Sequence, residues 1–148
     1  MRPATYGCPM PEPSSPPGGS LPRVLIADDD PAVRAALEAQ LRSGFAVVAT
    51  AGDTDEAIAL ASEHQPDLAI VDVQMPGGGG LRATREIRSA APRTAIVALS
   101  ADESERIVLD MLTAGAVTYV RKGVRAEELS ALLRESLDAA AHLPGRDG

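Results

Sequence analysis

The sequence contains few aromatic residues, one cysteine and one lysine. Aromatic residues make up 2% of the 148 positions and Trp is absent, so the core must be built from Ala, Val, Leu and Ile. The single cysteine, Cys8, excludes an intrachain disulfide, and nothing indicates a structural metal site. No apolar run reaches the length of a membrane span, and residues 1–10 lack the apolar segment of a secretory signal. We therefore expect a cytoplasmic protein.

Charge also limits the function classes. The formal net charge is −7, which gives no global attraction to nucleic acid or to an anionic membrane. A local basic patch is not excluded by this number. The contents of hydrophobic residues, 45%, and charged residues, 24%, are ordinary for a globular protein, and the length suits one domain with a real core.

The two ends of the chain differ from its middle. Seven of the 12 prolines lie in residues 1–22, together with Ser and Gly. Such a composition buries too little surface to fold, so we interpret residues 1–20 as a disordered leader. Residues 142–148 are interpreted as a loose C-terminal tail. One folded domain is expected over residues 21–141.

Within this domain, strand and helix patterns alternate. Short apolar or β-branched runs predict strands at 23–27, 45–50, 67–72, 94–100 and 117–121. Helical periodicity predicts helices at 31–43, 54–64, 81–90, 103–115 and 126–143. Asp30 is suited to capping the first helix, with Pro31 in its first turn, and Asp53 or Thr54 to capping the second. Five alternating strands and helices predict an α/β fold whose parallel sheet is covered on both faces.

Reactive side chains follow four of the five predicted strands. Asp28 and Asp29 follow the first, in the stretch VLIADDD, and Asp72 ends the third. Ser100 ends the fourth strand and Lys122 follows the fifth. Parallel strands deliver these residues to one edge of the sheet, where ligands bind in doubly wound folds.

That set of residues has a chemical logic. Three carboxylates at one edge repel each other, and a divalent cation such as Mg²⁺ relieves the repulsion with hard oxygen ligands. A carboxylate can also be a nucleophile toward phosphorus, and phosphoryl transfer then needs a metal, a cation and a hydroxyl to neutralise charge. Lys122 is the one Lys among 14 Lys and Arg residues. Its position after the fifth strand favours a functional need for a compact ammonium over the alternative, a codon bias that left one lysine by chance.

From about residue 22 to 141 the chain resembles the receiver domain of two-component response regulators. The motifs that carry the resemblance, in order and at family-like spacing, are VLIADDDPAVRAAL, PDLAIVDVQMPG, IVALSA and GAVTYVRK. The resemblance implies a flavodoxin-like doubly wound sheet of five parallel strands in the order 2-1-3-4-5. It also implies that the protein accepts a phosphoryl group from a histidine kinase or a histidine phosphotransfer protein.

The resemblance assigns roles around the acceptor. Asp72 would be the phosphoacceptor, Asp29 would bind Mg²⁺ or Mn²⁺ directly, and Asp28 would act close by, often through water. The backbone carbonyl of Gln74 would be a further metal ligand.

Three other residues would respond to phosphorylation. Ser100 would hydrogen-bond the phosphoryl group, and Lys122 would pair with Asp72 and then with the phosphoryl oxygens. Tyr119 falls on the aromatic switch position of the family and would turn inward; alone, it would be a half-buried packing residue. The signal would leave through the face of the fourth helix, fifth strand and fifth helix, which could also form a homodimer. No output domain follows the last helix, so we expect a stand-alone receiver or one module of a longer regulator.

Two loops depart from the family pattern. Lys122-Gly123 stands where the family commonly has Lys-Pro with a cis peptide bond, and Gly77 to Gly80 replace a Gly-x-Asp-Gly sequence. We expect altered loop geometry after the fifth strand and a flexible, less rigid turn at the glycines. Gln74 and Asp102 occupy positions at which the family tunes dephosphorylation.

Two alternative functions remain open from sequence. A haloacid-dehalogenase-like phosphatase would use Asp28 as nucleophile within Asp28-Asp29-Asp30, but Ala32 departs from its motif and the length leaves no room for a cap domain. A receiver-like interaction module would not be phosphorylated at all. Modification of Asp28 would indicate the phosphatase, and modification of Asp72 would indicate a receiver. Failure to bind Mg²⁺ would favour the interaction module.

Overall fold

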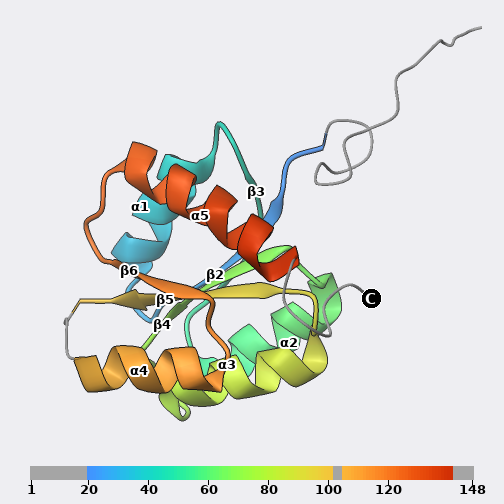
Figure 1. Ribbon diagram of the computed structural model, residues 1–148, viewed down its shortest axis with the longest axis vertical. Helices are drawn as coiled ribbons and strands as arrows, with labels where there is room; N and C mark the ends of the chain where they lie inside the picture. Colours follow the sequence, from blue (N-terminus) through green and yellow to red (C-terminus); the bar gives the residue numbers. More distant parts are fainter. Residues whose placement is uncertain (1–19, 102–104, 142–148) are drawn as a thin grey trace, which may run out of the picture.

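The protein folds around one five-stranded parallel sheet. The computed structural model describes residues 20–101 and 105–141 (Figure 1). The strands are β2 (Arg23–Ala27), β3 (Ala46–Ala51), β4 (Leu68–Asp72), β5 (Ala95–Ser100) and β6 (Thr118–Arg121). Their order in the sheet is β3-β2-β4-β5-β6, so the predicted order 2-1-3-4-5 is confirmed.

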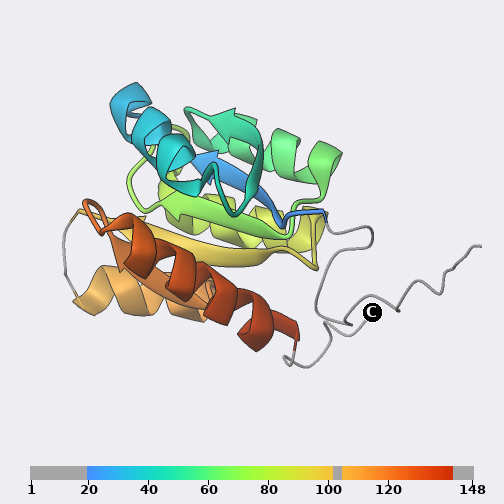
Figure 2. The ribbon, with the colours of Figure 1, turned by 90° about the horizontal axis from the view of Figure 1, so that it is seen from above.

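Five helices cover the sheet on both faces. They are α1 (Pro31–Leu41), α2 (Thr54–His64), α3 (Gly79–Ala90), α4 (Glu105–Ala114) and α5 (Ala126–Ala141). Figures 1 and 2 show α1 and α5 on one face and α2, α3 and α4 on the other. Each helix connects two parallel strands or follows the last one, as a doubly wound topology requires.

The alternation of side chains along β2 divides the core into two layers. Val24 and Ile26 pack with Leu41 and Leu133 in the layer beneath α1 and α5. Leu25 belongs to the layer beneath α2, α3 and α4. All residues of β4 and β5 are buried, because strands in the middle of a parallel sheet are covered by helices on both faces. The core is mainly Ala, Val, Leu and Ile, as predicted, and Phe45, Met75 and Met111 are buried in it as well.

Helix capping follows the predicted residues. The Asp30 carboxylate accepts a hydrogen bond from the Ala32 N–H at 2.8 Å, and Pro31 begins α1. The Asp53 carboxylate accepts from the Glu56 N–H at 2.8 Å and caps α2. Each cap satisfies one of the donors left unpaired at a helix start.

Some predicted element ends were displaced. Helix α1 ends at Leu41, because the Leu41 carbonyl accepts from the N–H groups of Gly44 and Phe45 in a closing turn. Helix α3 begins at Gly79, two residues before the predicted start. The predicted start of the fourth helix at 103–104 and end of the fifth at 142–143 lie outside the described residues. So do residues 1–19 of the leader predicted over 1–20 and the tail predicted over 142–148.

Within the described ranges, every helix is too short or too polar to cross a membrane.

Candidate functional site

Three carboxylates meet at the carboxyl edge of the sheet. Asp28 and Asp29 follow β2, and Asp72 is the last residue of the adjacent strand β4. One carboxylate oxygen from each residue lies within 4.8 Å of the other two. Asp28 and Asp72 are buried and Asp29 is exposed. The structure therefore brings together the acidic residues that the strand-end pattern predicts.

Asp28 is held from several sides. Its backbone N–H donates to the Ala51 carbonyl at 3.0 Å, and the Arg34 guanidinium donates to its carbonyl at 2.6 Å. Its carboxylate Oδ1 accepts from the Asp30 N–H at 2.8 Å. Asp30 thus caps α1 and orients Asp28 but is not a member of the carboxylate cluster. Arg34 gave no functional signal in the sequence, since an arginine inside a helix is commonplace.

Lys122 lies between the two buried carboxylates. Its Nζ is 3.0 Å from Asp28 Oδ2 and 3.2 Å from Asp72 Oδ2. Its backbone N–H donates to the Ser100 carbonyl at 2.9 Å, which fixes the start of the side chain beside β5. Burial alone would lower the pKa of Lys122, but the close contacts of its ammonium with the Asp28 and Asp72 carboxylates outweigh burial and raise it. The ammonium therefore stays charged at neutral pH.

The Asp72 carboxyl is less acidic than an exposed aspartic acid. Burial raises its pKa and the negative charge of Asp28 raises it further, while the Gln74 N–H and Lys122 act in the opposite direction. When all three carboxylates are ionised, the Lys122 ammonium between Asp28 and Asp72 balances one of their three negative charges. The edge of the sheet is therefore an electrostatically favourable position for a cation.

These residues fit a hard divalent cation. Asp28 Oδ2 is buried, and among the described residues no donor makes a well-aligned hydrogen bond to it; its partner is the Lys122 ammonium. Carboxylate oxygens from neighbouring strands are the ligands that Mg²⁺ and Mn²⁺ prefer. Gln74 lies beside Asp72 and donates its N–H to Asp72 Oδ1 at 3.2 Å.

Ser100 and Tyr119 lie at different depths. Ser100 is buried at the end of β5, the strand next to the one that ends in Asp72. Tyr119 lies on β6, and 40% of it is exposed. Its ring is therefore accessible, and the inward turn expected of a switch residue stays a prediction. Asp102 lies outside the described residues.

The segment from Val73 to Gly80 is here called the glycine loop. It leads from β4 into α3 and includes the first two residues of that helix. Gly77, Gly78 and Gly79 have φ values of +95°, +115° and +77°, a region that favours glycine. A Cβ atom at Gly80 would overlap the Asp72 carbonyl oxygen and would lie 2.8 Å from the Val73 Cα. Gly79 and Gly80 are the first two residues of α3, and the flexibility expected of the glycine turn stays a prediction.

The glycine loop also has fixed contacts that the sequence did not predict. The Thr54 N–H donates to the Pro76 carbonyl at 3.0 Å, and its hydroxyl donates to the Gly79 carbonyl at 3.1 Å. Thr54 is fully buried at the start of α2. These contacts attach the loop to the start of α2, and the expected loss of rigidity stays a prediction. No local sequence signal links Thr54 to a loop more than 20 residues away.

The loop after β6 differs from the family pattern as expected. Gly123 has a φ of +88°, which proline cannot adopt. No peptide bond in the described residues is cis. Lys122 nevertheless reaches both aspartates, so the loop change leaves the charged cluster in place.

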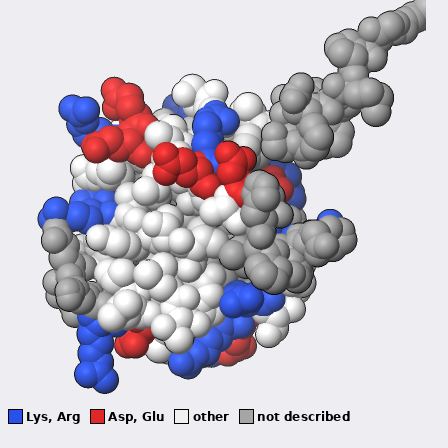
Figure 3. Space-filling view, viewed as in Figure 1, with Lys and Arg blue, Asp and Glu red and all other residues white. Residues whose placement is uncertain are grey.

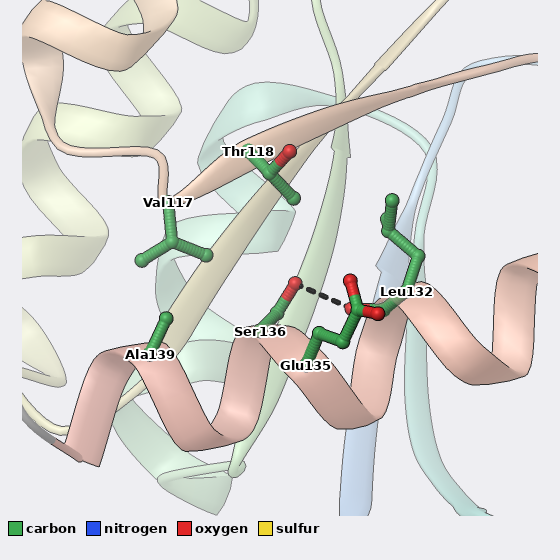
Figure 4. A pocket seen from close by; sticks show the side chains of 6 residues that line it. All are labelled: Val117, Thr118, Leu132, Glu135, Ser136 and Ala139. Carbon is green, nitrogen blue, oxygen red and sulfur yellow. Dashed lines mark hydrogen bonds between the residues drawn. The ribbon is translucent and has the colours of Figure 1, made fainter.

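A small hollow of about 160 Å³ lies away from this cluster. It is walled by the start of β6 and the second half of α5 (Figure 4). The Ser136 hydroxyl in its wall donates to the Leu132 carbonyl at 2.8 Å, which is a local helix contact. None of the predicted site residues lines this hollow.

The fold and the carboxylate cluster define a doubly wound α/β domain with an acidic strand edge. Residues 24–134 match the response regulator receiver domain family. The chain is 42% identical over 110 residues to the transcriptional regulatory protein PdtaR of Mycobacterium tuberculosis, covering 72% of this chain and 52% of that protein. It is 40% identical over 114 residues to the transcriptional regulatory protein YxjL of Bacillus subtilis, covering 76% and 52%. The chain belongs to the receiver domain family and spans about half the length of these relatives.

Solved structures agree with this assignment. A two-component response regulator of the LuxR family from Aurantimonas is 34% identical, with a TM-score of 0.75 over 81% of this chain and 87% of that one. The CheX-CheY-BeF3-Mg²⁺ complex from Borrelia burgdorferi contains a chain 28% identical, with a TM-score of 0.72 over 79% and 88%. Membership of this family disfavours the haloacid-dehalogenase-like alternative.

Proposed function

We propose that Asp72 accepts a phosphoryl group from the phosphohistidine of a histidine kinase or phosphotransfer protein. The observation that carries the proposal is the carboxylate cluster, with the Lys122 Nζ 3.2 Å from Asp72 Oδ2. Because a phosphohistidine is made from ATP, the proposal includes a cytoplasmic location. The intact set of Asp28, Asp29, Asp72, Ser100 and Lys122 favours it over an unphosphorylated interaction module.

Each residue has a part in the transfer. An Asp72 carboxylate oxygen attacks phosphorus, the new O–P bond forms as the N–P bond breaks, and the electron pair leaves with the imidazole. Lys122 neutralises charge on the phosphoryl oxygens, and Ser100 offers a hydroxyl next to them. Asp28, Asp29, Asp72 and the Gln74 carbonyl would hold Mg²⁺ or Mn²⁺, which supplies further charge neutralisation. Catalysis is limited to this self-phosphorylation and to hydrolysis of the product.

The output is proposed to leave through the face of α4, β6 and α5. Figure 3 shows this face as a broad area without charged side chains, bordered by acidic residues on the α5 side. Leu109 and Leu112 on α4 are exposed by 60% and 37%, and Tyr119 on β6 by 40%. Exposed apolar area of this kind is typical of protein interfaces, so an output partner or a second copy would bind here.

The proposal is tested by intact-mass measurement after incubation with acetyl phosphate. Wild-type protein should gain one phosphoryl group with Mg²⁺ and none with EDTA, and Asp72→Asn should gain none. A gain that survives in Asp72→Asn would favour the phosphatase-like use of Asp28. The absence of any gain in the wild type would favour the unphosphorylated interaction module.

A further inference from the structure

Arg82 on α3 connects the glycine loop to α2. Its Nη1 donates to the Gly77 carbonyl at 2.5 Å and lies 2.9 Å from Asp55 Oδ1. Its Nε donates to Glu86 Oε2 at 2.7 Å, one helical turn along α3. One guanidinium therefore contacts the loop, the first turn of α2 and its own helix.

The backbone of the loop is shaped for this side chain. A Cβ atom at Gly78 would lie 2.7 Å from the Arg82 Cδ and 3.2 Å from its Cβ. The absence of a side chain at Gly78 thus leaves the space through which Arg82 crosses the loop. Gly78 also occupies the N-cap position of α3, where it makes no side-chain capping hydrogen bond. Gly78 thus offers no side chain to hold the loop to α3, and Arg82 provides a side-chain contact through the Gly77 carbonyl.

Gln74 lies between fixed points on the same loop. On one side, the Val73 N–H donates to the Leu99 carbonyl at 3.0 Å, and the Val73 carbonyl accepts from Gly80. On the other side, the carbonyls of Pro76 and Gly77 are held by Thr54 and Arg82. The Met75 side chain is buried in the core. The backbone around Gln74 is therefore held on both sides, and Thr54 and Arg82 supply the contacts on the side of α3.

We infer that Arg82 is a positioning residue for the metal site. It holds the glycine loop against α2 and thereby fixes the Gln74 carbonyl relative to Asp72. This inference rests on the proposed function, because Arg82 would position a ligand of the divalent-metal site that the proposed function requires. The role requires a forked donor, since one guanidinium contacts Gly77, Asp55 and Glu86 together, which a single ammonium does less well.

The test compares Mg²⁺ affinity by isothermal titration calorimetry in Arg82→Met and in Arg85→Met. Methionine keeps the apolar stem above Gly78 and removes the polar contacts. Arg85 is exposed on the same helix and has no described side-chain hydrogen bond or ion pair. Arg85→Met removes the same charge as Arg82→Met and is therefore the matched control. We expect the dissociation constant of Arg82→Met to rise about tenfold, the low end for residues that orient metal ligands. Arg82→Lys should lie between Arg82→Met and the wild type.

Thermal unfolding in EDTA, measured on the same proteins, separates positioning from structure. A lower midpoint for Arg82→Met with an unchanged Mg²⁺ affinity would show a merely structural role and overturn the inference. If Arg82→Met does not fold, Asp55→Asn replaces it, and an unchanged affinity there overturns the inference equally. If the wild type binds no Mg²⁺, the proposed function fails and this inference fails with it. If the wild type binds Mg²⁺ and Arg82→Met matches it, the inference alone fails.

Discussion

At the scale of single residues, the decisive feature is an ammonium shared by two buried carboxylates. Asp28 and Asp72 would repel each other in a buried environment, and the Lys122 Nζ lies within 3.2 Å of an oxygen of each. Lys122 or a divalent cation can compensate this repulsion. Stability without metal should therefore depend on the lysine, and metal should reduce that dependence.

Replacement of Lys122 by Met tests this compensation. In EDTA we expect Lys122→Met to lower the free energy of unfolding by about 3 kcal/mol, the low end for removing one partner of a buried ion pair, because Lys122 keeps some exposure. Added Mg²⁺ should restore part of the loss. Urea unfolding with and without Mg²⁺ measures both effects. Arg125→Met, which breaks an exposed contact to Glu128, should cost less than about 0.5 kcal/mol. Equal losses in the two variants would contradict the account.

The raised pKa of Asp72 predicts an unusual pH dependence. A carboxyl whose pKa is raised in the folded state binds its proton more tightly there than in the unfolded chain. Its contribution to stability is then present below the unfolded pKa and is lost as the pH rises through the folded pKa. In EDTA, Asp72→Asn should therefore unfold a few degrees above the wild type at neutral pH, and the difference should disappear in acid. A wild type that is more stable than Asp72→Asn at neutral pH without metal would contradict this reasoning.

At the scale of elements, the turn from β4 to α3 places the acceptor. Gly80, the second residue of α3, lies directly against the Asp72 carbonyl, so the helix and the acceptor strand approach more closely than any side chain allows. Gly123, on the loop after β6, has open space where its Cβ would be, and its positive φ is its one constraint. The two glycines thus serve different physical needs.

Alanine substitutions distinguish these two needs. Gly80→Ala should lower the free energy of unfolding by about 2–3 kcal/mol, because backbone atoms must move to admit the methyl group. It should also weaken Mg²⁺ binding, because the backbone carbonyl group of Asp72 is among the groups that must move. Gly123→Ala should cost about 1 kcal/mol for its left-handed backbone and leave Mg²⁺ binding unchanged. Chemical denaturation and calorimetry check both expectations. Unchanged Mg²⁺ binding in Gly80→Ala would contradict the expectation that this turn positions Asp72 for the metal.

Strand ends were the part of the site that sequence could predict. Asp28, Asp72, Ser100 and Lys122 each follow a clear apolar run, and parallel strands must bring their ends to one edge. The partners of the loops could not be predicted in this way. Thr54 donates to a carbonyl 25 residues away, whereas Arg34 and Arg82 donate to carbonyls six and five residues earlier in the chain. Contacts of a side chain to a loop carbonyl leave no pattern of residue types that the sequence reveals. The start of α3 was predicted too late, because glycines are poor helix formers in isolation.

At the scale of the whole molecule, the sheet separates the chemistry from the proposed output. The carboxylates lie at the carboxyl edge of the central strands β2 and β4, whereas the exposed apolar residues lie on α4 and the edge strand β6. Strand β5 lies between them and ends in Ser100, and it pairs with both β4 and β6. A change at Asp72 would therefore reach the α4–β6 face through one intervening strand.

The most direct measurement identifies the phosphorylated residue. The wild-type protein is incubated with Mg²⁺ and acetyl phosphate, the aspartyl phosphate is reduced with borohydride to homoserine, and the position is read by peptide mass spectrometry. The account predicts reduction at Asp72, in a Mg²⁺-dependent manner. Reduction at Asp28, or at no aspartate, would contradict the claim that the ends of β2, β4 and β6 form a phosphoacceptor site centred on Asp72.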